Sequence, residues 1–265
     1  MCRWTAWSGA PKYLEELVCD PEHSLIHQSR NAFSCKTQVN ADGFGMAWYD
    51  NRKEPCIYKD VRPAWADANL LQLAHHVRSP LFLAHIRAST GTATNHDNCH
   101  PFTHGRWCFM HNGQVGGYEH IRKKLDGMIP DHLYRYRTGA TDSEALFLIA
   151  VGYGLDHDPV GAMVRAVEDV EQMAREQGGL PYMRFAAAWS DGKHLFAARY
   201  ASDNLAPSLF FRSFQDGTTV VSEPFDTARD AWMEVPTSSI LMVADGFVQQ
   251  QPFRLSMARP LEIPS

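Results

Sequence analysis

The chain has 265 residues, of which 45% are apolar and 21% are charged, and its formal net charge is -5. These are the proportions of a globular protein that is long enough for one large domain or two small ones and needs no disulfide or metal for stability. The 25 lysines and arginines are dispersed along the sequence, which argues against a nucleic-acid or membrane partner.

Cysteine usage and hydropathy indicate in which cellular compartment the protein acts. No run reaches the ~18 apolar residues of a membrane span, and the N-terminus lacks the apolar core of a signal peptide. We therefore expect a cytoplasmic protein with reduced thiols. The six cysteines form no CxxC motif and no close pair; they are Cys2, Cys19, Cys35, Cys56, Cys99 and Cys108.

The first half of the chain predicts mainly strands. Apolar and aromatic runs bounded by turn residues predict strands over 3–8, 43–49, 81–86 and 106–110. Helical spacing of apolar residues predicts a helix over 65–77, which Pro80 is expected to stop. The last of these strands runs into His111-Asn112-Gly113, a turn sequence.

The second half predicts two helices followed by hairpins. Thr141-Asp142-Ser143-Glu144 is typical of a helix start, and Asp158-Pro159 opens a second amphipathic helix. Strands follow over 184–190, 194–200, 209–213, 218–222, 240–244 and 247–250. The order of strands, helices and more strands without a βαβ repeat favours an α+β fold with antiparallel sheets. No linker divides the sequence, so we expect a single domain over 1–265.

Cys2 is the first candidate for chemistry. A thiol attacks only as a thiolate, and removal of Met1 would place an α-amino group on the same residue as that thiol. The amine could accept the thiol proton directly or through water, so one residue would supply both nucleophile and base. Many proteins begin with Met-Cys by chance, and Cys2 alone would carry little weight.

Other residues suit acyl transfer from a γ-glutamyl group. The Asn112 side-chain amide and the Gly113 N–H could stabilise an oxyanion, although Asn-Gly is more often a hairpin turn. Arg87 could bind the substrate carboxylate through its planar guanidinium, or it could belong to a structural ion pair. Asp142 could bind the substrate ammonium, or it could be an ordinary acidic residue in the first turn of a helix.

The ordered set of motifs resembles the class II glutamine amidotransferases, and in particular their small stand-alone members. The similarity covers about residues 1–245. Its motifs are Met1-Cys2, Asn40-Ala41-Asp42-Gly43-Phe44-Gly45, His85-Ile86-Arg87-Ala88-Ser89-Thr90, His100-Pro101-Phe102, His111-Asn112-Gly113, Thr141-Asp142-Ser143-Glu144 and Ser222-Glu223-Pro224 with Trp232 and Val235-Pro236.

The resemblance implies a four-layer αββα fold of the N-terminal-nucleophile hydrolases, in which two antiparallel sheets lie between helix layers. By similarity Cys2 is the nucleophile, its freed amine is the base, and Asn112 and Gly113 form the oxyanion hole. The resemblance further places Arg87, Thr90, His111 and Asp142 around the substrate and gives the glycine-rich segment 40–45 a structural role. No cofactor and no metal is implied.

One departure from the larger family members bears on the reaction. They carry a second domain that uses the released ammonia, whereas only about 20 residues follow position 245 here. We therefore expect hydrolysis of glutamine or another γ-glutamyl compound through a thioester on Cys2. Ammonia transfer to a separate protein partner remains an alternative.

Two rival interpretations belong to other classes. His96, His100, His104 and His111, together with Cys99 and Cys108, could bind zinc, although they lack CxxC or HExxH spacing. A non-catalytic subunit that binds a partner through a sheet edge is the second rival. The intact set of Cys2, Arg87, Asn112, Gly113 and Asp142 argues against it.

Overall fold

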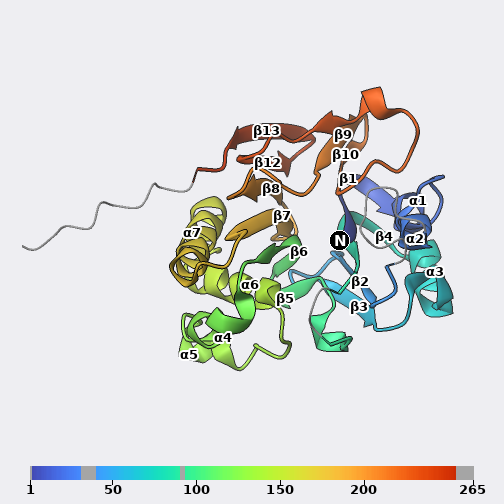
Figure 1. Cartoon of the computed structure of the whole chain (residues 1–265). Helices are drawn as coiled ribbons and strands as arrows, with labels where there is room; N and C mark the ends of the chain where they lie inside the picture. Colours follow the sequence, from blue (N-terminus) through green and yellow to red (C-terminus); the bar gives the residue numbers. More distant parts are fainter. Residues whose placement is uncertain (1, 31–39, 90–92, 255–265) are drawn as a thin grey trace, which may run out of the picture.

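A computed structural model describes residues 2–30, 40–89 and 93–254 (Figure 1). It contains two sheets, and every strand pairing found in these ranges is antiparallel. The β1 sheet has seven strands in the order β11-β9-β10-β1-β4-β2-β3. Their bounds are β1 Arg3–Tyr13, β2 Phe44–Trp48, β3 Cys56–Asp60, β4 Arg78–Ile86, β9 Phe210–Phe214, β10 Gly217–Val221 and β11 Met233–Glu234.

The second sheet, called the β6 sheet, has six strands in the order β13-β12-β8-β7-β6-β5. Most of it follows the central helices in sequence, as the order of elements predicted. Its strands are β5 Phe102–His104, β6 Trp107–Val115, β7 Met183–Ser190, β8 Leu195–Ala201, β12 Ser239–Ala244 and β13 Phe247–Pro252.

Helices cover the outer face of each sheet and complete four layers (Figure 1). The expected αββα arrangement is therefore confirmed. The helices on the β1 sheet are α1 Glu15–Val18, α2 Leu25–Arg30 and α3 Ala68–His76. Those on the β6 sheet are α4 Tyr118–Asp126, α5 Asp131–Tyr134, α6 Asp142–Gly152 and α7 Pro159–Gln177. Short 3₁₀ turns are η1 Ala64–Ala66, η2 His96–Asn98 and η3 Arg229–Ala231. No helix in the described ranges is long and apolar enough to cross a membrane.

The core is divided by the two-residue alternation of the strands. On β1, Trp4 and Ala6 pack between the sheets, whereas Trp7 packs beneath the helices of the β1 sheet. On β6, Cys108 and Met110 likewise face the space between the sheets. Residues at even positions of β1 and β6 therefore meet in the central layer, and this parity also governs the candidate site at the strand ends.

The start of α6 forms largely as predicted. The Thr141 hydroxyl accepts a hydrogen bond from the Glu144 N–H at 3.2 Å, as an N-cap should. The Glu144 carboxylate does not reach back to the cap. It accepts hydrogen bonds from Thr138 and Gly139 and pairs with the buried Arg137. Glu144 thus fixes the loop that leads into α6.

The predicted turn at His111-Asn112-Gly113 is wrong. β6 continues to Val115, and Asn112 and Gly113 pair with Ala186 and Phe185 of β7. Glycine is needed here for space, because a Cβ on Gly113 would lie 1.9 Å from the Arg184 carbonyl oxygen. The Asn-Gly dipeptide therefore reflects a close backbone approach within a sheet.

Pro80 does not end the preceding helix. α3 ends at His76, and β4 already begins at Arg78, two residues before the proline. Pro80 falls where the register between β1 and β4 shifts, between the pairs Ser8–Leu81 and Lys12–Ser79. A residue without an N–H is tolerated at such an irregularity.

Candidate active site

A cavity of about 630 Å³ opens where β1 begins and where β4 and β6 end, beside α4 and α6. It brings together residues from five separate segments of the sequence. Its lining includes Cys2, Arg87, Ala88, Ser89, His100, His111, Gly113, Tyr118, Arg122 and Asp142.

Cys2 lies immediately before β1 at the floor of this cavity. The Ala88 N–H donates to its Sγ at 3.4 Å, and Sγ lies 3.6 Å from the Ala88 carbonyl oxygen. The parity of β1 directs the side chain of Cys2 to the same layer as Trp4. Backbone from the end of β4 therefore holds the sulfur in place.

Opposing electrostatic effects act on the pKa of the Cys2 thiol. Burial raises the pKa of the thiol above its ordinary value, whereas the hydrogen bond from Ala88 and the charges of Arg87 and Arg3 lower it. Burial is the largest of these effects. A thiol whose pKa is raised in this way would need a base to form the thiolate.

Arg87 is held at the end of β4 by main-chain and side-chain oxygens. Its guanidinium donates to the Asp42 carbonyl at 3.2 Å, to the Ser89 hydroxyl at 3.2 Å and to the Ala93 carbonyl at 3.3 Å. The residue is 3% exposed yet lines the cavity. A planar guanidinium on the cavity wall matches the geometry of a carboxylate ligand.

The 40–45 segment supports that position. The Asp42 carboxylate accepts a hydrogen bond from the Ser89 N–H at 2.7 Å, and the Asp42 carbonyl accepts from Arg87. Gly43 adopts a φ of 105°, which favours glycine. The segment therefore braces the end of β4 from the side.

Asn112 and Gly113 lie at the cavity end of β6. Gly113 lines the cavity, and Asn112 lies one residue before it and is only 2% exposed. Asn112 has the parity of Cys108 and Met110, so its side chain points into the layer that also contains Cys2. Gly113 thus shares the cavity with Cys2, and Asn112 is the residue next to it on the same strand.

Asp142 is the first residue of α6 and reaches across to β6. One carboxylate oxygen accepts from the Val115 N–H at 2.9 Å, and the other accepts from the Ser143 N–H at 2.8 Å. These contacts fix a carboxylate on the wall of the cavity. An anion in this place could hold an ammonium group of a ligand.

His111 has parity opposite to Asn112 and faces the helices. Its Nε2 lies 3.2 Å from the Arg184 carbonyl, which can only accept, so Nε2 carries the proton. Burial lowers the pKa of the ring, and the Ser143 hydroxyl at 2.9 Å donates to the remaining nitrogen, Nδ1. Both nitrogens of His111 are therefore engaged by the protein.

The sequence did not predict a contact between two further histidines, His85 and His100. His100 lines the cavity, and its ring lies against that of His85 with centroids 4.2 Å apart and an angle of 32° between the planes. Burial lowers the pKa of His85 to about 3 and takes that of His100 well below its usual range. Neither nitrogen of His100 has a hydrogen-bond partner within the described ranges. The pair is a neutral, buried patch beside Arg87.

The outer wall of the cavity was also missed. From the sequence, the loops over 28–37 and 199–207 are candidates for this wall, and residues 31–37 lie outside the described residues. Arg199 instead bonds to Pro207 and Glu234, away from the lining. The outer wall comes from the segment that leads into α4 and from α4 itself. Its residues include Gln114, Gly117, Tyr118, Glu119 and Arg122.

The expectations for Thr90 and for a zinc site have different outcomes. Thr90 lies outside the described residues. The candidate zinc ligands have separate surroundings, since His96 is exposed, His104 meets Tyr136 edge-on, and the ring of His100 lies against that of His85. In the part of the chain that the structure describes, no group of three or more such side chains could hold a metal ion.

Comparisons with known proteins agree with this arrangement. The family model described as glutamine amidotransferases class-II matches residues 17–209. A probable glutamine amidotransferase of Saccharomyces cerevisiae is 34% identical over 92% of this chain and 82% of its own length. A gamma-glutamyl-hercynylcysteine sulfoxide hydrolase of Mycolicibacterium smegmatis is 30% identical over 95% of this chain and 100% of its own.

Solved structures show the same architecture. A glutamine aminotransferase class-II domain protein from Silicibacter pomeroyi superposes with a TM-score of 0.77 at 43% identity, covering 95% of this chain and 99% of that one. The glutamine phosphoribosylpyrophosphate amidotransferase of Bacillus subtilis gives a TM-score of 0.66 at 15% identity, over 98% of this chain and 50% of its own. The second likeness concerns the fold alone.

Proposed function

Because this chain belongs to the class II glutamine amidotransferases, we propose that it hydrolyses the γ-amide of a γ-glutamyl compound through a thioester on Cys2. One observation carries the proposal. The Cys2 sulfur, held by the Ala88 N–H, lies in one cavity with Arg87, Gly113 and Asp142.

The chemistry begins at Cys2 after loss of Met1. The freed α-amino group takes the thiol proton, and the thiolate adds to the γ-carbonyl carbon of the substrate. The Asn112 amide and the Gly113 N–H donate to the oxyanion of the tetrahedral intermediate. The intermediate collapses when the C–N bond breaks and the Cys2 ammonium protonates the leaving nitrogen, which leaves a γ-glutamyl thioester.

Water completes the reaction. The Cys2 amine, now neutral, removes a proton from water as it attacks the thioester carbonyl. A second tetrahedral intermediate expels the sulfur, which regains the proton, and glutamate leaves. Because burial raises the pKa of the Cys2 thiol, a base on the same residue is well suited to this site.

The glutamyl head group is held by charges of opposite sign. Arg87 binds the α-carboxylate with a planar guanidinium, and Asp142 binds the α-ammonium. Support comes from the hydrogen bonds that fix both side chains on the cavity wall. His111, whose nitrogens are engaged, acts by holding Ser143 beside Asp142. Thr90 is a further substrate contact by similarity alone.

The leaving group decides between hydrolysis and ammonia transfer. We favour a γ-glutamyl compound as substrate, since one relative is a gamma-glutamyl-hercynylcysteine sulfoxide hydrolase. If glutamine is the substrate, a separate protein partner would have to accept the ammonia. We place this reaction in the cytoplasm. Hydrolysis by a cysteine thiolate and its own amine needs no cofactor.

The test is release of glutamate from a panel of glutamine, γ-glutamyl dipeptides and γ-glutamyl anilides. Cys2→Ala should abolish turnover and leave substrate binding, measured by calorimetry, within about threefold. The exposed Cys56 on β3 provides the matched control, and Cys56→Ala should retain full activity. Turnover that survives in Cys2→Ala would remove the proposal.

A further inference from the structure

The outer wall of the cavity contains a cation that the proposed chemistry does not use. Arg122, on α4, lines the same cavity as Cys2 and Arg87. Its side chain is 47% exposed, and the ion pair found for it in the described residues is a long one, 3.8 Å from Asp126. Asp126 is engaged more closely by Arg137 at 3.0 Å. Arg122 therefore keeps donors for a ligand.

The start of α4 adds to the positive potential of this wall. Gly117 and Tyr118 line the cavity, and Gly117 caps the helix with a φ of 62° and no side-chain hydrogen bond. The first N–H groups of a helix lack intrahelical partners and favour negative charge. They lie one turn before Arg122, so the two effects have the same sign.

The wall is held rigidly. The Tyr118 hydroxyl accepts from Arg137 at 2.6 Å and donates to the Ala140 carbonyl at 3.1 Å. At the other side, a Cβ on Gly116 would lie 1.8 Å from the Gly179 carbonyl oxygen, so the backbone segments touch. A ligand contact with Arg122 would therefore need little reorganisation of the helix.

We propose that Arg122, with the start of α4, binds a carboxylate on the leaving half of the substrate. The preferred substrate is then a γ-glutamyl amino acid or peptide. Glutamine would release only ammonia, which has no carboxylate for Arg122 to bind. A guanidinium matches a carboxylate with two parallel hydrogen bonds. This inference rests on the proposed function.

The test compares two substrates that differ by one charge, γ-glutamylglycine and γ-glutamylglycinamide. The unsubstituted chain should cleave the first with a kcat/KM about tenfold higher. Arg122→Gln should abolish that preference by raising KM for γ-glutamylglycine and should leave glutamine and the amide unchanged. Equal cleavage of both substrates by the unsubstituted chain would overturn the inference.

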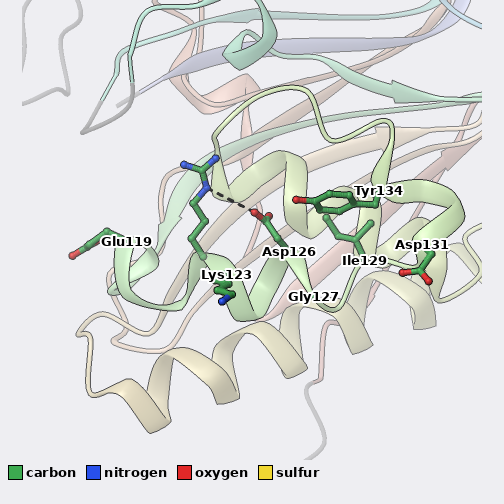
Figure 2. A pocket seen from close by; sticks show the side chains of 8 residues that line it. Glu119, Lys123, Asp126, Gly127, Ile129, Asp131 and Tyr134 are labelled. Carbon is green, nitrogen blue, oxygen red and sulfur yellow. Dashed lines mark ion pairs between the residues drawn. The ribbon is translucent and has the colours of Figure 1, made fainter.

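Lys123 supplies a matched control. It follows Arg122 on α4, is exposed, borders the neighbouring groove shown in Figure 2, and is not among the residues that line the Cys2 cavity. Lys123→Gln should keep the substrate preference. An equal loss of that preference in Lys123→Gln and Arg122→Gln would overturn the inference, because the preference would then depend on the net charge of the surface. Glu119→Gln should improve γ-glutamylglycine cleavage about twofold, because it removes from the wall a negative charge that repels the carboxylate of the leaving group.

The outcomes separate the two proposals. If glutamine or a γ-glutamyl anilide is cleaved but the glycine and glycinamide substrates are not distinguished, only the role of Arg122 fails. If no γ-glutamyl compound in the panel releases glutamate, the proposed function itself fails, and the role of Arg122 fails with it.

Discussion

The inner and outer walls of the cavity are built in different ways. The inner wall, formed by strand ends and the start of α6, carries side chains that are almost fully buried, such as Arg87 at 3% and Asn112 at 2% exposure. The outer wall is a surface helix whose cation, Arg122, is 47% exposed. The inner residues are fixed by many hydrogen bonds, whereas Arg122 has one long ion pair.

This difference separates two tasks. A γ-glutamyl group is the same in every substrate of the family, so its binding site can be part of the sheet scaffold. The leaving group varies, and a surface helix can change its side chains without disturbing the core. We therefore expect inner-wall substitutions to affect every substrate and outer-wall substitutions to affect only some.

The largest effect is expected at Glu144, which joins the two walls. Its carboxylate pairs with Arg137, and Arg137 holds Tyr118 of the outer wall. Glu144→Gln removes one of the two carboxylates that pair with the buried Arg137, and Asp126 remains as the other. The substitution should therefore lower the free energy of unfolding by about 3 kcal/mol, the lower end for a broken buried ion pair. Chemical denaturation measures this. Arg165→Gln, in an exposed pair, should cost under about 1 kcal/mol, and equal losses would contradict the distinction.

Asn112→Ala tests the inner wall as an oxyanion site. Removing one such donor should lower kcat about 10²–10³-fold with little change in KM, because the contact forms in the transition state. The loss should be the same for glutamine and for γ-glutamyl peptides. A substrate-dependent loss in steady-state kinetics would place Asn112 with the leaving group instead.

Arg87→Lys should raise KM for all substrates by about tenfold, since a point charge replaces a planar fork. Arg122→Gln should raise it only for substrates with a leaving-group carboxylate. The pattern across one substrate panel therefore distinguishes the walls. Unchanged KM in Arg87→Lys would remove that residue from glutamyl binding.

Acid should destabilise the inner wall through its neutral histidines. The folded pKa of His85 is about 3, well below the usual value, so only the unfolded chain takes up a proton as the pH falls. Stability is then full above about pH 6.5 and declines toward pH 3 by about 1.4 kcal/mol per pH unit for this histidine. His85→Gln should reduce the slope by one proton.

Much of the inner wall could be predicted because its residues sit in local motifs. The strands, the αββα layers and the helix start at Thr141 follow from periodicity, capping and resemblance. The turn predicted at Asn112-Gly113 failed because the approach of Arg184 on β7, which requires a glycine, is a long-range contact.

The outer wall was missed for a different reason. α4 reads as a charged segment, and only Ile121 and Leu125, four residues apart, mark its buried face. A Gly116-Gly117 pair before that spacing is the signal that could have predicted the helix. The contact between His100 and His85 depends on a loop meeting a strand, which no local pattern reveals.

The most direct measurement is the intact mass of a fully active preparation, before and after labelling with a glutamine-mimicking electrophile. The account predicts a chain that lacks Met1 and gains one label, located on Cys2 and matched by loss of activity. A fully active chain that retains Met1, or a label on another cysteine that accompanies inactivation, would contradict the account.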